Sequence, residues 1–179
     1  LRERDALNRQ VAAATLVGRV IGTFAATGLL VLFSTHALSI LFAVLILAAV
    51  SLSTMGWRVA PTTTNLSIAG VASGIMGTIT AAGGPPFAIA MQHLAPATMR
   101  STLGVVFFAG TIVSLSALAW VGRMGSGQWL LSLVLLPWML AGFLASSRLA
   151  RHISKATIRR WLLGTAAISA CIILLRVWL

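Results

Sequence analysis

Long apolar runs separated by short polar segments make up most of this chain. Predominantly apolar stretches occupy residues 11–33, 38–55, 101–121, 129–149 and 158–179. Each is long enough, as a helix, to cross a hydrocarbon core of about 30 Å. The pattern predicts an all-α polytopic membrane protein with about five or six transmembrane helices, plus a Gly/Pro-broken, possibly re-entrant segment between residues 65 and 94.

The broken segment is apolar but contains Gly83, Gly84, Pro85 and Pro86 in succession. Proline lacks a backbone donor and glycine permits unusual backbone angles, so a regular helix is not expected to continue through these residues. Such breaks are tolerated at membrane depth where they are buried in protein or line a watery cavity, and they often mark a transporter's binding site. The alternative is a hinge, or close helix packing through small residues.

Composition supports the membrane class and argues against a nucleic-acid-binding protein. Hydrophobic residues are 59% of the chain and charged residues 8%, with a mean hydropathy of +1.00. The net charge of +11 comes from basic residues in the segments between apolar runs, as expected for a membrane protein. Four of them recur every three or four residues, at Arg148, Arg151, Lys155 and Arg159, and predict contact with anionic membrane lipids.

Acidic residues are almost absent, which excludes most catalytic chemistry. The two carboxylates, Glu3 and Asp5, both lie at the start of the chain. Paired-carboxylate catalysis, a Ser-His-Asp triad and carboxylate metal sites are therefore not expected. The three histidines lack metal-ligand spacing, and a single cysteine cannot form an intrachain disulfide. We predict no catalytic residues, no metal and no cofactor, and a protein that is not an enzyme.

Basic residues also bear on the path of the broken segment. If it crosses the membrane once, the basic residues outside Arg19 divide equally between the two sides. If it dips in and returns, ten share one side, with Arg123 and Arg176 on the other. Because basic residues concentrate on the cytoplasmic side, the second arrangement, a re-entrant segment, is favoured.

A weak internal repeat divides the chain unequally. A shift of 120 residues aligns Gly22 with Gly142 and Ser34 with Ser154, among five identities. Residues 1–60 would then be the C-terminal part of a first repeat, with two membrane helices. Residues 61–179 would be a complete second repeat with its break at 83–86. Because the chain begins with leucine rather than methionine, we expect a preceding segment in the native gene product.

Three motifs resemble the C-terminal repeat of the TauE/SafE sulfite exporter family. They are Gly74-Ile75-Met76-Gly77, then Ala82-Gly83-Gly84-Pro85-Pro86-Phe87, then Arg100-Ser101-Thr102. The resemblance is good over residues 61–179 and looser over 11–55. It implies a multi-pass transporter of the bacterial inner membrane, moving sulfite, a sulfonate or a related small anion.

The chain departs from the family in lacking the first glycine-rich motif of the N-terminal repeat. The alternative function is therefore a non-transporting membrane interaction module, or a half-size subunit that needs a partner. A homo-oligomer also stays open. The expected partners are membrane lipids and a small anion, and no nucleic acid.

Candidate substrate-binding residues cluster at the break and just after it. Glycines let an anion approach the backbone, a helix starting at the prolines would present N–H groups, and hydroxyls and Arg100 would add donors and charge. The candidates are Thr80, Gly83, Gly84, Pro85, Pro86, Gln92, Arg100 and Thr102. Alternatively, Arg100 is an ordinary cytoplasmic anchor, and we favour a Thr102 hydroxyl bonded back to its own helix.

Arg19 is the only cation well within a predicted span. It is either a buried partner for an anion or a side chain that extends to the interface, and the second interpretation is favoured because it lies only a few turns from its helix start. Glycines within the spans predict tight helix packing, at Gly18, Gly22, Gly142 and Gly164.

Overall fold

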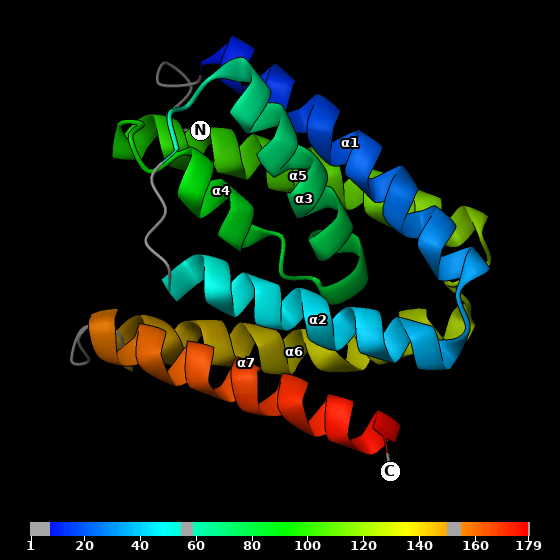
Figure 1. Ribbon diagram of the computed structural model, residues 1–179. Helices are drawn as coiled ribbons and strands as arrows, with labels where there is room; N and C mark the ends of the chain where they lie inside the picture. The colour runs from blue at the N-terminus through cyan, green and yellow to red at the C-terminus, as the bar shows by residue number, and fades with distance from the viewer. Residues whose placement is uncertain (1–7, 55–58, 150–154, 179) are drawn as a thin grey trace.

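The computed structural model describes residues 8–54, 59–149 and 155–178, with side chains described except at 145–149, 155–160 and 176–178. These residues form helices and no strands (Figure 1). The helices are α1 (Arg9–Leu32), α2 (Thr35–Thr54), α3 (Thr63–Thr80), α4 (Gly84–Ala90), α5 (Pro96–Trp120), α6 (Ser126–Leu149) and α7 (Lys155–Trp178). The predicted all-helical class is confirmed.

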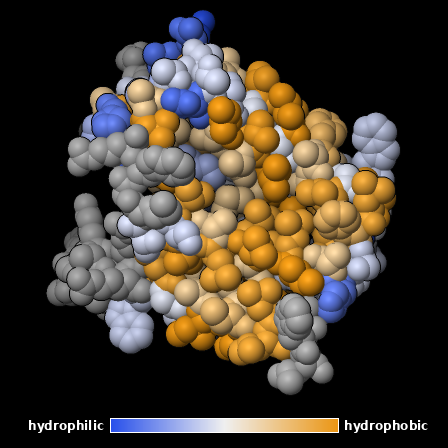
Figure 2. Space-filling model, viewed as in Figure 1, coloured by the Kyte–Doolittle hydropathy of each residue, from blue (hydrophilic) through white to orange (hydrophobic). Residues whose placement is uncertain are grey.

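Helix lengths and surface chemistry fit a polytopic membrane protein. α1, α2, α5 and α6 are each long and apolar enough to cross a membrane, and the part of α7 at Trp161–Leu175 is a shorter apolar helix. The α6 side chains that the structure describes are all exposed, among them Trp138 and Phe143. Figure 2 shows an apolar surface over most of one face, with hydrophilic residues gathered where α1 begins. Such a surface suits lipid contact.

Several helix starts follow directly from local sequence. The side chain of Asn8 accepts hydrogen bonds from the first turn of α1, and the Ser34 hydroxyl accepts one from the Ala37 amide at the start of α2. Thr62 accepts from the Asn65 amide at the start of α3, at 3.3 Å. These caps satisfy amides that have no intrahelical partner. Pro96 opens α5, a position where its missing N–H costs nothing.

α1 and α3 run parallel in close backbone contact. A Cβ on Gly18 would overlap the carbonyl oxygen of Ser67, and a Cβ on Gly22 would overlap that of Val71. The residue numbers of the contacting pairs rise in the same direction along both helices, so the two helices are parallel. The predicted tight packing at Gly18 and Gly22 is confirmed.

α3 contributes two glycines of its own to this interface. A Cβ on Gly70 or on Gly74 would overlap a backbone carbonyl of α1. Glycines from both helices thus interlock, which small residues at four-residue spacing permit in membrane helices. The same prediction was wrong for Gly142 and Gly164, since a Cβ at either would meet open space. Their helices, α6 and α7, make no comparable backbone approach there.

α5 is also parallel to α1. Ser114 of α5 lies 3.3 Å from Thr23 of α1 between hydroxyl oxygens. Just after the end of α5, Arg123 donates from Nη2 to the carbonyl of Leu30, near the end of α1. α1, α3 and α5 therefore all begin at the same end of the molecule.

The predicted break separates α3 from α4, and the chain reverses there. Ala81 caps α3 in the left-handed conformation, with φ of 57°. α4 then packs back along α3, so that Phe87 and Met91 share a buried cluster with Leu66 near the start of α3. The two helices form a hairpin, as Figure 1 shows. Because α5 then starts beside the start of α1, the chain returns to the end it came from, as a re-entrant segment requires.

Candidate anion-binding site

A cavity of about 660 Å³ lies between α1, α2, α3 and α5, beside the tip of the hairpin. Its lining combines polar side chains from α1, α3 and α5 with apolar ones. The lining residues are Arg19, Phe42, Gly77, Thr78, Ile79, Thr80, Ala81, Gly83, Phe107, Thr111, Ser114, Leu115 and Leu118. Arg19 is the one ionisable side chain in this lining as the structure describes it.

Arg19 is buried inside the protein, with 4% of its surface exposed. Its Nη1 donates to the Ser73 hydroxyl at 2.7 Å, and its guanidinium lies over the Phe107 ring, 5.1 Å from the centroid. Its Nε has no hydrogen-bond partner. The favoured prediction, that Arg19 extends to the membrane interface, was therefore wrong. The side chain points inward because neighbouring helices leave it a slot.

Three glycines from separate segments form that slot. A Cβ on Gly77 of α3 would lie 3.2 Å from Nη2 of Arg19, and a Cβ on Gly83 would lie 3.0 Å from Nη1. A Cβ on Gly110 of α5 would overlap Nε. A full-length arginine fits between these backbones only because no side chain occupies the same space.

Ser73 connects the arginine to the hairpin tip. It accepts from Arg19 and donates to the carbonyl of Gly83 at 2.6 Å. Both groups are buried, and Ser73 itself is 0% exposed. A single hydroxyl therefore orients the guanidinium and holds the loop between α3 and α4 against α1.

No carboxylate among the residues that the structure describes balances the positive charge on Arg19. The two carboxylates in the sequence, Glu3 and Asp5, precede the described residues. An arginine keeps its proton at physiological pH, and a charge at the centre of a membrane helix costs about 3 kcal/mol or more. The bond to Ser73 recovers about 1.5–3 kcal/mol and the contact with Phe107 about 2 kcal/mol. These contacts offset the desolvation of the guanidinium but supply no negative charge.

Three hydroxyls gather one helical turn further along α1 and α5. Thr78 lies 3.0 Å from Ser114 and 3.4 Å from Thr23, and Ser114 lies 3.3 Å from Thr23, between side-chain oxygens. Thr78 and Ser114 line the cavity with Arg19. A hydroxyl both donates and accepts, so this cluster can turn donors toward a bound oxyanion.

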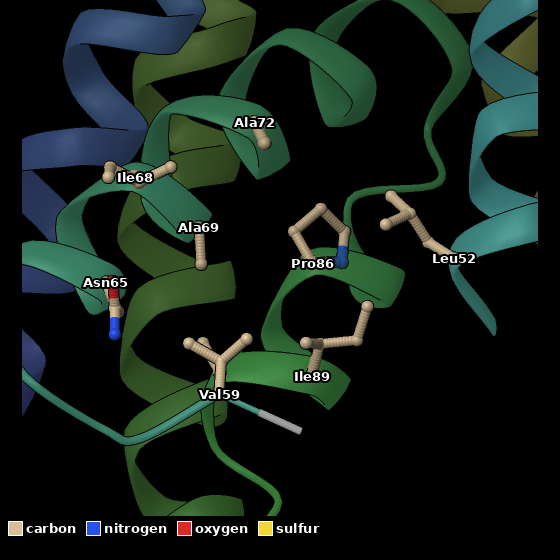
Figure 3. A pocket seen from close by; sticks show the side chains of 9 residues that line it. Leu52, Val59, Asn65, Ile68, Ala69, Ala72, Pro86 and Ile89 are labelled. Carbon is tan, nitrogen blue, oxygen red and sulfur yellow. The ribbon is translucent and has the colours of Figure 1, made fainter. Parts of the chain in front are cut away.

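The predicted residues of the break divide between this cavity and a second one. Thr80 and Gly83 line the cavity with Arg19. Pro86 instead lines a smaller, apolar cavity of about 240 Å³ between α2, α3 and α4 (Figure 3). Figure 3 shows Pro86 facing α3. Pro85 is half-buried in the first turn of α4, and Gly84 is exposed, where a Cβ would meet nothing within 4 Å.

The start of α4 offers fewer donors than the sequence suggested. α4 has seven residues, and Pro85 and Pro86 occupy its first turn, where each removes an N–H group. Gly83 precedes it as the N-cap. The positive charge in the cavity therefore comes from a side chain of α1 rather than from this helix end.

The remaining candidates lie away from the cavity. Gln92 and Arg100 are exposed, outside its lining, and each has an interaction partner. Thr102 is fully buried but does not line the cavity, and its hydroxyl has no hydrogen-bond partner. The favoured prediction that this hydroxyl bonds back to its own helix was wrong. The basic side chains predicted to meet lipid lie outside the described side chains, at Arg148, Arg151, Lys155 and Arg159.

A pattern in the sequence marks the buried face of α1, and it was missed. Thr15, Arg19, Thr23 and Thr27 recur every four residues and are all buried. In a helix, this spacing places all four on one face. A polar stripe in an otherwise apolar membrane helix faces the protein interior, because lipid cannot satisfy it. The same stripe would have indicated a buried Arg19.

Comparison with known proteins agrees with this architecture. The family model for the sulfite exporter TauE/SafE matches residues 1–173, nearly the whole chain. The match also takes in residues 1–60, where the sequence resemblance was looser. No curated protein matches the chain, and no solved structure does. With its apolar helices and its broken α3–α4 hairpin, the chain is a multi-pass membrane protein that belongs to the TauE/SafE sulfite exporter family of transporters.

Proposed function

We propose that this protein is a secondary transporter that carries a small sulfur-containing anion, such as sulfite or a sulfonate, across the bacterial inner membrane. One observation carries the proposal: a buried arginine, Arg19, borders a cavity with no carboxylate to balance it. Family membership supports the class of substrate. In this proposal the transported anion itself supplies the missing negative charge.

The cavity suits an oxyanion with an optional organic part. Oxygens of the anion would accept hydrogen bonds from the guanidinium of Arg19, which borders the cavity, and from Thr78 and Ser114. The lining also includes apolar side chains, among them Phe42 and Leu118, against which a short organic group would pack. The volume of about 660 Å³ lies within the range of small-molecule sites.

The helix directions support one orientation in the membrane. With α1, α3 and α5 parallel, Arg9 and Arg100 lie near the end where these helices begin, and Arg123 follows the other end of α5. Positive charge favours the cytoplasmic side, so we place the open end of the hairpin there. A small anion would then enter the cavity past the hairpin tip from one side and leave past the ends of α1 and α5 on the other.

Catalysis is not part of the proposal. The described residues contain no cluster of histidine, cysteine or acidic side chains that would hold a metal ion. The cavity also offers no carboxylate to act as an acid or base. Binding and release, without a bond-breaking step, are the chemistry that its hydroxyls and guanidinium support.

Flux of sulfite into proteoliposomes tests the proposal. The wild-type protein should move sulfite, and Arg19→Gln should lower the initial rate at least about tenfold, because the anion loses its charged partner. Arg9→Gln is the matched control, since Arg9 is an exposed arginine at the start of the same helix. Its rate should stay near that of the wild type.

Two results would contradict the proposal in different ways. Equal rates for wild type and Arg19→Gln would place the substrate elsewhere in the molecule. No flux from wild-type protein that is folded and correctly inserted would favour the alternative, a non-transporting membrane interaction module or a half-size subunit that needs a partner.

A further inference from the structure

We propose that the Arg19 site accepts anions with a single negative charge and excludes dianions. The inference rests on the proposed function, which it narrows from sulfur-containing anions in general to monovalent ones. For sulfite the transported form is then hydrogensulfite. The charge balance of the cavity leads to this conclusion.

One full positive charge faces the cavity. Arg19 supplies it, and the other lining side chains that the structure describes are neutral. The neutral lining side chains include Phe42 of α2, Thr78 and Thr80 of α3, and Thr111 and Ser114 of α5. His36 and His93 are exposed and lie outside the lining. A monovalent anion beside Arg19 gives a neutral site, whereas a dianion leaves a net negative charge in a low-dielectric interior.

The end of α3 opposes a second negative charge. Ile79, Thr80 and Ala81, which close this helix, all line the cavity. The C-terminal end of a helix carries about half a negative charge on its unpaired carbonyls. The opposite pole at the start of α4 is weak, because α4 has seven residues and begins with two prolines. The backbone therefore adds negative rather than positive potential.

The hydroxyls contribute hydrogen bonds without changing this balance. Thr78 and Ser114 can each donate one bond to an anion oxygen, and they can also accept one from a protonated oxygen. Hydrogensulfite carries such a proton, and a sulfonate carries an organic group in its place. Both match a site with one cation, nearby hydroxyls and apolar walls.

The proposal accounts for proton movement without a proton-carrying side chain. Hydrogensulfite loses its proton near neutral pH, so hydrogensulfite and the sulfite dianion both exist under physiological conditions. A site that admits hydrogensulfite alone moves one proton with every anion. Sulfite flux should then follow the hydrogensulfite fraction and fall as the pH rises through this ionisation, while flux of methanesulfonate stays level.

Binding to the purified protein in detergent tests the charge rule independently of transport. Methanesulfonate carries one charge and sulfate two at any pH from mildly acidic to mildly alkaline, and their sulfur–oxygen groups are similar in size. Calorimetric titration should give methanesulfonate an affinity at least about tenfold higher than sulfate. Arg19→Gln should abolish the binding of methanesulfonate.

A second cation should reverse the preference. Thr111 lines the cavity from α5 and is exposed to it. Thr111→Lys should bring the affinity for sulfate up to or above that for methanesulfonate, while Thr111→Gln, which has a neutral side chain of moderate length, should keep the wild-type order.

Equal binding of both anions by the wild-type protein would overturn the charge rule, as would an unchanged order in a folded Thr111→Lys variant. Neither result would affect the proposed function if sulfite is still transported. Absent sulfite flux together with selective methanesulfonate binding would end the proposed transport function and leave the charge rule standing.

Discussion

Arg19 of α1 lies directly against Gly110 of α5, so closely that a Cβ on the glycine would overlap Nε of the arginine. The contact explains how a buried guanidinium fits beside another transmembrane helix. It also means that the position of the charge depends on a residue that has no side chain.

Gly110→Ala should displace the Arg19 side chain and lower sulfite flux at least about tenfold, since the charge moves away from its hydrogen-bond partner and the cavity. Gly104→Ala on the same helix is the matched control, because its Cβ would meet nothing within 4 Å. It should leave flux unchanged. Initial rates in proteoliposomes provide the measurement. Similar rates for the two variants would show that Arg19 tolerates the added methyl group.

Ser73→Ala should destabilise the hairpin tip. The change removes the acceptor of Arg19 Nη1 and the donor to the Gly83 carbonyl, and it leaves both groups buried without a partner. Each unsatisfied group costs about 1–3 kcal/mol, so thermal unfolding in detergent should occur at a lower temperature. Ser39→Ala is the control, because its exposed hydroxyl bonds only to its own helix. A melting temperature that is the same in both variants would indicate that water replaces the serine.

Gly70→Ala should weaken the contact between α1 and α3. Its Cβ would overlap the carbonyl oxygen of Thr15, and forcing the two backbones apart costs about 1–3 kcal/mol. Gly28→Ala, in open space on α1, should gain up to about 1 kcal/mol from its better helix propensity. Thermal melts of the purified variants should therefore shift in opposite directions. A neutral or stabilising Gly70→Ala would mean that the helices separate at little cost.

Cysteine labelling tests the re-entrant arrangement. In a Cys171→Ser background, Thr64→Cys and Ala95→Cys should react with an impermeant maleimide from the same side of the membrane. These positions flank the α3–α4 hairpin and are exposed. Ser126→Cys, at the start of α6, should react from the opposite side. Labelling of Thr64→Cys and Ala95→Cys from opposite sides would show instead that the hairpin segment spans the membrane once.

The class of protein and the break were predictable because each depends on local chemistry. Apolar length alone indicates a membrane helix, and two glycines followed by two prolines end a helix in any setting. The break appears where expected, with α3 ending at Thr80 and α4 starting at Gly84.

The polar stripe on α1 could have indicated that Arg19 faces inward, but the space that receives its side chain depends on contacts between distant segments. Arg19 lies only a few turns from the start of its helix. From the sequence, its long side chain could extend either to the membrane interface or into the protein interior. The interior has room for this side chain only because Gly77, Gly83 and Gly110 surround it without side chains of their own. Those residues lie on three segments, and no local pattern places them around one side chain.

The glycine contacts between α1 and α3 determine which parts of the molecule can move. Two backbones that touch at Gly18, Gly22, Gly70 and Gly74 cannot slide past each other without collision. α1 and α3 therefore form a fixed frame that keeps Arg19 at constant depth. The short α4 belongs to this frame as well, because Phe87 and Met91 are buried against Leu66 of α3 and Ser73 holds the carbonyl of Gly83. Any motion that opens the cavity to either side must therefore come from helices outside this frame.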